Sequence, residues 1–212
     1  LRPRRQRQMC IRDSNMTMTI TGAGMLWVGW FGFNGGSALA ANGDAGMAIL
    51  VTHLSAASAA FAWMCLEWFK FGKPSALGAV TGMVAGLGTI TPASGFVGPG
   101  GALIIGLAAG VICFNATIFL KQKLGVDDSL DVFPVHGVGG ALGTILVAVF
   151  ASSTLGVFSG QGDGLAMLDQ FSIQILGVLA TGGYTAVLTF VLLKFVDLAI
   201  GLRVSDEEEI QG

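Results

Sequence analysis

Charged residues are scarce in this chain, because Asp, Glu, Lys and Arg together make up 11% of 212 residues, whereas 53% are hydrophobic. An ordinary soluble domain carries about 25% charged residues. So few polar side chains cannot cover a water-facing surface, which excludes a soluble globular protein. Long apolar runs, 33 glycines and a mean hydropathy of +0.74 instead predict an all-α, polytopic transmembrane helical bundle.

Patterns for metal binding and catalysis are also missing. The three cysteines are widely spaced and odd in number, so they indicate neither a disulfide framework nor a metal site. Only two histidines are present, and no further ligand stands at metal-binding spacing from either. Nucleotide fingerprints, the serine-nucleophile elbow and His-based zinc motifs are absent. We therefore expect a protein that is not an enzyme and has no cofactor, metal or nucleic-acid partner.

Apolar runs separated by polar or Gly/Pro-rich breaks predict six membrane spans. The expected spans are residues 15–35, 46–69, 75–91, 99–121, 131–152 and 169–200. The last is longer than the bilayer core requires, so it is expected to tilt or to project beyond the bilayer. Together the spans form a transmembrane domain, 15–204, followed by an acidic cytoplasmic tail, 205–212. We expect that tail to be solvated, with docking of a cytoplasmic partner as the alternative.

The cationic residues support the number of spans. With six spans, all eleven Lys and Arg residues fall on one side of the membrane, whereas the three loops on the other side contain none. Positively charged loops stay in the cytoplasm, so both termini are expected to be cytoplasmic, in an inner or plasma membrane. One interior span more or fewer would scatter these charges over both sides.

Residues 1–14 contain five arginines and differ in composition from the rest of the chain. They form either a basic cytoplasmic leader or a non-native stretch joined to a truncated protein, and we favour the second interpretation. A signal peptide is a further alternative, because Ala38-Leu39-Ala40 resembles a cleavage site. The apolar run before it is longer than the usual ~7–15 residues, which argues against that alternative.

Glycines recur every four residues in three of the expected spans. Small residues at this spacing let helices approach closely where lipid removes the usual hydrophobic driving force. The pattern therefore predicts a tightly packed bundle. The glycines concerned are Gly78, Gly82 and Gly86, then Gly106 and Gly110, then Gly139 and Gly143.

One of the two histidines, His136, begins an apolar run that reaches Phe150. An α-helix rises about 21 Å over that distance, which leaves the imidazole inside the bilayer core. An ionisable group at this depth is costly and functional by default. A neutral imidazole both donates and accepts a hydrogen bond, which suits a proton relay or a path for a small polar molecule. The alternative is a core histidine bonded to a carbonyl of a neighbouring helix. Pro134 suits the first turn of a helix, so irregular backbone is expected before it.

The other histidine, His53, lies in a segment rich in small residues. We expect Thr52, Ser55 or Ser58 to satisfy its hydrogen bonds, in a structural role.

Aromatic residues close the first span, from Trp27 to Asn34, and are typical of a belt at the membrane interface. A belt explains Phe31 and Phe33 less well, because glycines surround them. A ring at this point is able to gate a pore or to face a cation. Thr91 and the proline after it end the third span, as a plain helix stop does.

Several motifs, taken in order and spacing, resemble the ammonium transporter (Amt/MEP/Rh) family. The likeness runs from about Asn15 to the end and is similar to the C-terminal half of such a transporter, helices six to eleven. It implies a partial ammonium-transporter fold and a homotrimer with one pore in each subunit. The motifs are Gly29–Asn34, Ile90–Ala93, Gly101–Gly106, Asp127–Asp128, Asp131–Phe133, Val135–Gly140 and Gly201–Val204.

The resemblance also assigns roles to single residues. It implies that His136 is the second member of a twin-histidine pair in the pore and that Val132 lines the pore below it. Phe33 resembles one of two phenylalanines that close the outer vestibule, and Ser37 resembles the hydroxyl of the ammonium recruitment site. The pore-supporting residues implied by the family are Asp131, Thr91 and Trp30.

The implied function is an ammonium/ammonia channel or transporter, embedded in membrane lipid, that recruits ammonium outside and conducts it past paired histidines. The first histidine, the partner phenylalanine and the tryptophan of the recruitment site belong to the family's first five helices. Pro134 stands where the family usually has glycine. An ammonium sensor on the same fold and a non-conducting truncated fragment remain alternatives. A PII-type regulatory protein is the family's cytoplasmic partner, but this chain ends near where the regulatory segment begins.

Overall fold

The computed structural model describes residues 15–151 and 166–202, which form helices joined by turns. This confirms the all-α class. The α-helices are α2 (Met16–Gly36), α3 (Gly43–Phe71), α4 (Ala76–Ile90), α5 (Pro99–Ile118), α6 (Gly139–Phe150) and α7 (Met167–Ala199). A 3-10 turn, η1 (Thr91–Ala93), follows α4. The π-helical segment η2 (Phe119–Lys123) follows α5, and a second one, η3 (Phe133–Val138), directly precedes α6. The predictions for residues 1–14 and 205–212 lie outside the described residues.

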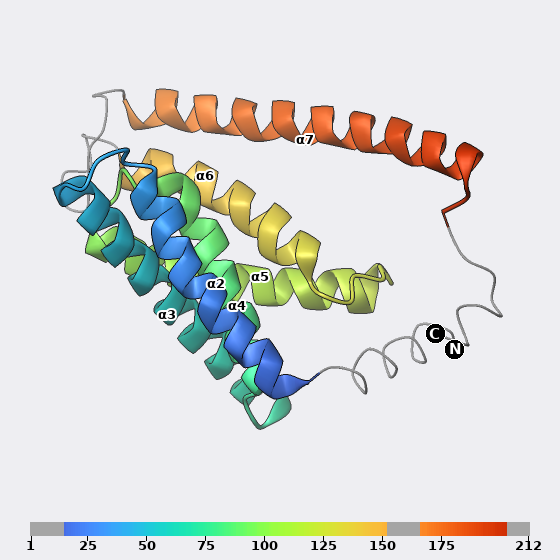
Figure 1. Cartoon of the computed structure of the whole chain (residues 1–212), viewed down its shortest axis with the longest axis horizontal. Coiled ribbons are helices and arrows are strands. Elements are labelled where there is room, and N and C mark those ends of the chain that lie inside the picture. Colours follow the sequence, from blue (N-terminus) through green and yellow to red (C-terminus); the bar gives the residue numbers. More distant parts are fainter. Residues whose placement is uncertain (1–14, 152–165, 203–212) are drawn as a thin grey trace. The chain divides into compact units, whose positions relative to one another are not determined.

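Five helical segments of the described chain are long and apolar enough to cross a membrane: Gly43–Phe71, Ala76–Ala93, Pro99–Lys123, Phe133–Phe150 and Met167–Ala199. The first expected span forms α2, which at 21 residues has sufficient length but is not among these five. Its threonines, glycines and tryptophans are much less hydropathic than Leu, Ile or Val, which lowers the mean hydropathy. α2 packs against α3 and α4 nonetheless (Figure 1).

Local signals set the helix ends. The side chains of Asn15, Asn42 and Ser75 each accept a hydrogen bond from the backbone N–H three residues later, which caps α2, α3 and α4. Gly72 ends α3 with φ +78°, a left-handed conformation that costs a glycine little. Pro99 begins α5, at a position where its missing N–H would have no partner.

The glycines of α4 pack against α3, as the spacing predicts. A Cβ added at Gly82 would lie 2.5 Å from the Trp63 Cβ, and one at Gly86 would lie 2.5 Å from the Ser55 carbonyl oxygen. Real Cβ atoms do not approach so closely. The Ser55 hydroxyl then donates to the Gly86 carbonyl across the same contact, at 2.9 Å. Gly82 and Gly86 therefore set the distance between α3 and α4.

The glycines of α5 and α6 make equally close contacts. A Cβ at Gly110 would lie 2.6 Å from the Ala59 carbonyl oxygen of α3, and one at Gly143 would overlap the Thr89 carbonyl oxygen of α4. The prediction of tight packing is thus confirmed for all three rows. α4 is held on both sides, by α3 and by α6.

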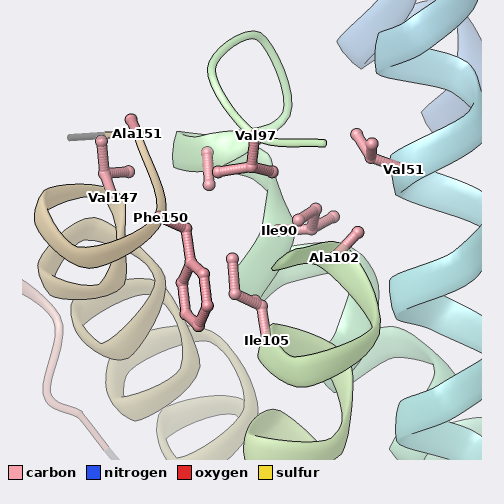
Figure 2. Close-up of a cluster of buried hydrophobic side chains, with 9 residues drawn as sticks. Val51, Ile90, Val97, Ala102, Ile105, Val147, Phe150 and Ala151 are labelled. Carbon is pink, nitrogen blue, oxygen red and sulfur yellow. The ribbon is translucent and has the colours of Figure 1, made fainter. Parts of the chain in front are cut away.

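A cluster of buried apolar side chains joins the ends of α3, α4, α5 and α6. Figure 2 shows the Phe150 ring lying beside Ile105 in this cluster. The same ring packs at Gly101, where an added Cβ would lie 3.3 Å from Phe150 Cδ1. Burial of Ile90 and Val97 in the cluster fixes the end of α4 and the turn that follows it.

α7 is one continuous helix of 33 residues (Figure 1). At 1.5 Å per residue it is about 50 Å long, which exceeds the ~30 Å thickness of a bilayer core. It agrees in length with the last expected span.

Candidate functional site

The end of α2 brings four of the predicted site residues together, which we call the Phe33 group: Trp30, Phe33, Ser37 and Thr91. The Trp30 indole donates a hydrogen bond to the Thr91 hydroxyl at 2.7 Å, and that hydroxyl donates to the Leu87 carbonyl at 2.7 Å. The rings of Trp30 and Phe33 lie 6.0 Å apart and are tilted by 58°. The Ser37 hydroxyl donates to the Phe33 carbonyl at 2.8 Å.

The residues of the Phe33 group differ in their exposure. Trp30 and Thr91 are partly buried, whereas Ser37 is exposed and Phe33 is 64% exposed. The hydrogen bond of Trp30 fixes the indole against α4, and the indole in turn lies beside the Phe33 ring. Phe33 is therefore presented by a support that is itself hydrogen-bonded.

A buried amide, for which sequence analysis predicted no separate role, anchors the same end of α2. Asn34 is 3% exposed, and its side-chain N–H donates to the Thr52 hydroxyl of α3 at 2.9 Å. Thr52 donates in turn to the Ala48 carbonyl at 2.6 Å. A Cβ at Gly35 would lie 2.8 Å from the Ile49 side chain, so α2 and α3 are also close at this point. An amide near the end of an apolar helix was the only sequence signal for this contact.

His136 lies in the π-helical segment η3. Pro134 and Val135 of this segment are buried, whereas His136 is exposed. A Cβ added at Gly88 of α4 would lie 3.9 Å from His136 Nδ1. The imidazole thus stands beside α4, at a residue that leaves it room. Val132, one turn earlier, is 51% exposed.

α4 connects the two groups. His136 lies beside Gly88, and Trp30 of the Phe33 group is bonded to Thr91, which directly follows α4 and lies three residues after Gly88. Three residues of α-helix rise about 4.5 Å. The imidazole and the support of the Phe33 ring therefore contact residues that are one helical turn apart.

Asp131, the remaining predicted residue, precedes η3 in a left-handed conformation with φ +58°. It forms an ion pair with Lys121 of η2, and the two side chains are 18% and 14% exposed. Both residues line a cavity of ≈250 Å³ between the ends of α3, α4 and α5. The sequence did not identify Lys121, because the pairing joins positions ten residues apart through irregular backbone.

The expected hydrogen-bond partners of His53 bond elsewhere. The Thr52, Ser55 and Ser58 hydroxyls donate to backbone carbonyls of other residues, at 2.6, 2.9 and 3.2 Å. His53 instead stacks on Trp27, with ring centroids 5.1 Å apart, and lies 5.9 Å from the Phe31 ring. Phe31 and Phe33 therefore have different surroundings, and only Phe33 lies beside Trp30. The signal for the stacking was the spacing of Trp27 and Phe31, one helical turn apart.

Within the described residues, no group of three His, Cys, Asp or Glu side chains is placed to hold a metal ion.

The model of the Ammonium Transporter Family matches residues 1–212. The chain belongs to the ammonium transporter family. It is 46% identical to the ammonium transporter Amt1 of Archaeoglobus fulgidus over 203 residues, which cover 95% of this chain and 51% of that protein. It is 45% identical to the ammonium transporter of Aquifex aeolicus over 207 residues, covering 98% of this chain and 48% of that protein. The chain thus spans about half the length of these relatives.

Solved structures agree with this assignment. A protein named Sensor Amt Protein superposes with a TM-score of 0.86 at 34% identity, covering 93% of this chain and 48% of that one. Candida albicans Mep2 superposes with a TM-score of 0.81 at 32% identity, covering 92% and 44%. The ammonium transporter fold is therefore shown for the half that this chain represents.

Among the predicted site residues of this family member, Phe33, Ser37 and His136 present an exposed aromatic ring, an exposed hydroxyl and an exposed imidazole. The ring offers a π face to a cation. The imidazole offers one hydrogen-bond donor and one acceptor when neutral.

Proposed function

We propose that the complete protein containing this chain is an ammonium/ammonia channel or transporter, and not an enzyme. The observation that carries the proposal is the exposed His136 imidazole beside Gly88, three residues along α4 from the bonded support of Phe33. Family membership supports the substrate, because relatives that match most of this chain are named ammonium transporters.

The chemistry of the substrate explains the arrangement. A bare cation in an apolar medium costs many kcal/mol. Ammonium must therefore either release its proton or have partners that compensate its charge before it crosses. In this proposal, Ser37 and the π face of Phe33 hold the cation at the outer end; the Phe33 ring is exposed and lies beside Trp30. Past that ring, neutral ammonia needs only hydrogen-bond partners, and His136 supplies one of each kind. Val132 then provides an apolar wall. The resemblance places a second histidine in the half of the transporter that precedes this one.

Membrane placement belongs to the same proposal. The eleven Lys and Arg residues fall on one side of six spans, which supports a multi-pass protein of the inner or plasma membrane with its C-terminus in the cytoplasm. We propose a homotrimer with one pore in each subunit, on the basis of the family. Cross-linking of the purified complete protein in lipid, followed by mass measurement, tests the number of subunits.

The main test is His136→Ala in the complete protein, with uptake of labelled methylammonium by a transport-deficient cell. We expect the maximal rate to fall about tenfold or more, or the selectivity against other cations to be lost, because removal of a hydrogen-bonding group in an apolar path leaves the substrate unpaired there. His53→Phe is the matched control, because it replaces the only other histidine and keeps the ring stacking on Trp27. Wild-type rate and selectivity in His136→Ala would contradict the assigned role.

An ammonium sensor is the second candidate, and the superposition on a protein named Sensor Amt Protein favours keeping it. A sensor requires ammonium binding at the Phe33 group without the need for flux through His136. Ammonium binding that persists in His136→Ala while a downstream response continues would favour sensing. A PII-type protein is the regulatory partner that we propose to test for, by ammonium-dependent co-purification with the complete protein. We expect the chain of 212 residues alone not to conduct, because it spans about half of the relatives' length.

A further inference from the structure

The segment that carries His136 begins with unusual backbone. Asp131 has φ +58°, a conformation that non-glycine residues seldom adopt, and η3 follows with π-helical hydrogen bonding. Both features are less stable in isolation than a plain α-helix and persist only where neighbouring groups determine them. Pro134 and Val135 are buried in this segment, which fixes one side of it. Other groups must hold the opposite side of the segment.

The backbone N–H groups at the start of η3 have acceptors that stabilise this segment. The Asp128 carboxylate accepts from the Val132 N–H at 2.9 Å with Oδ1 and from the Phe133 N–H at 2.8 Å with Oδ2. Pro134 has no N–H, and the Val135 N–H donates to the Asp131 carbonyl at 3.0 Å. The first four positions of the helix are thus fully satisfied, two of them by one carboxylate.

The Asp131 side chain ties this start to a different helix. Its ion-pair partner Lys121 lies in η2, where the Leu124 N–H donates to the Phe119 carbonyl at 3.2 Å and closes the π-helical turn. Side chains that are 14% and 18% exposed are partly withdrawn from water, which strengthens their attraction. Lys121 therefore connects the end of α5 to the residue that sets the direction of the His136 segment.

We propose that Lys121, Asp128 and Asp131 form a clamp, the Asp131 clamp, whose role is to position the His136 imidazole beside α4. The inference rests on the proposed function, because positioning matters only if His136 faces the substrate. Asp128 fixes the first turn and the ion pair fixes Asp131 in its left-handed conformation. The buried pair Pro134 and Val135 then acts as the pivot, so that a change at Asp131 is transmitted to His136 five residues later. These three residues are positioning residues, since each of them is partly buried, whereas His136 is exposed.

The test uses the complete protein with Lys121→Met and Asp131→Asn. Methionine keeps the length of the side chain, and asparagine tolerates positive φ, so each change removes charge while leaving the backbone conformation accessible. Lys123→Met and Asp127→Asn are the matched controls, because these residues are exposed neighbours in the same two segments. Lys121→Arg should retain the pair. The double variant Lys121→Met with Asp131→Asn measures whether the two charges act as one unit.

Two measurements distinguish positioning from plain stability. One is methylammonium uptake over a range of concentrations, and the other is hydrogen exchange of the Val132 and Phe133 amides. We expect the maximal rate to fall about tenfold in each charge-removing variant, with an unchanged KM because the Phe33 group is untouched. Hydrogen exchange should speed up at residues 132–133 in the same variants. The double variant should match the single ones, and Lys121→Arg and both controls should resemble the wild type.

Other outcomes overturn the proposal. Faster exchange with a wild-type maximal rate would mean that Pro134 and Val135 hold His136 without the clamp. A loss of rate as large in Lys123→Met as in Lys121→Met would assign the effect to general surface charge. If His136→Ala itself leaves uptake unchanged, the proposed function fails, whereas the exchange measurement still decides whether the clamp holds the segment.

Discussion

The two ends of the proposed path are held by different chemistry. The Phe33 group stands on regular α-helices, and neutral groups support it: the Trp30 indole on the Thr91 hydroxyl, and the Asn34 amide on Thr52. The His136 segment stands on π-helical backbone, and charges support it through Asp128 and the pair of Asp131 with Lys121.

The difference follows from the solvent available to each. Asn34 is 3% exposed, and a charge at such a buried site in a membrane helix would be costly. Asp131 and Lys121 are 18% and 14% exposed, and they line a cavity, so charges remain tolerable there. The irregular backbone leaves two N–H groups to be bound at once, and the two oxygens of the Asp128 carboxylate accept from both, whereas a side-chain amide has one oxygen. Neutral bonds therefore serve where the helix is regular, and charges serve where it is not.

Both ends of the proposed path rest on α4, so the largest effect is expected from a substitution that displaces this helix. In Gly143→Ala the new methyl group overlaps the Thr89 carbonyl, which is backbone and cannot move aside. We expect a loss of about 1–3 kcal/mol or more, with a large fall in the yield of folded protein. Thermal unfolding in detergent measures it. Gly140→Ala is the control, because nothing lies within 4 Å of its Cβ, and helix propensity should make it neutral or stabilising. Equal behaviour of the two variants would contradict the packing.

The helical spans and the closeness of their packing could be predicted from the sequence because they depend on local signals. Apolar run lengths placed the spans, and the four-residue glycine spacing predicted contacts that Gly82, Gly86 and Gly143 make. α2 shows the limit of mean hydropathy, since its Thr and Gly residues lower the average although it packs within the bundle. Run length predicted a helix there where hydropathy alone would not.

The candidate site was less predictable for a physical reason. A π-helical turn differs from an α-helical one by one residue in hydrogen-bond register, and side-chain periodicity over six residues does not resolve that difference. Pairings such as Lys121 with Asp131, or His53 with Trp27, depend on how two segments are placed in space. The sequence predicts a depth for His136 within its span, but it could not identify the neighbour Gly88.

A smaller effect compares the two kinds of support directly. Asn34→Ala removes a buried donor while Thr52 keeps its bond to the Ala48 carbonyl, so we expect a loss of about 1–3 kcal/mol. This loss should be the same from about 0.05 M to about 1 M KCl, whereas the loss in Lys121→Met should shrink as salt screens the pair. Thermal unfolding at several salt concentrations measures both. Asn115→Ala, an exposed amide bonded to the Val111 carbonyl, is the control. A salt-dependent Asn34 effect would remove the distinction between the two ends.

The smallest effect concerns the support of Phe33. In Thr91→Val the shape of the side chain is kept, but the Trp30 indole loses its acceptor at 2.7 Å, whereas Thr91→Ser retains the hydroxyl. An unpaired, partly buried N–H costs about 1 kcal/mol, so the indole is expected to shift toward water and to carry the Phe33 ring with it. We expect the discrimination between ammonium and methylammonium to change about fivefold in Thr91→Val and to stay near wild type in Thr91→Ser. Competition of ammonium against methylammonium uptake measures this ratio. If valine and serine gave the same ratio, the hydroxyl would have no part in placing the ring, and the Phe33 group would depend on helix packing alone.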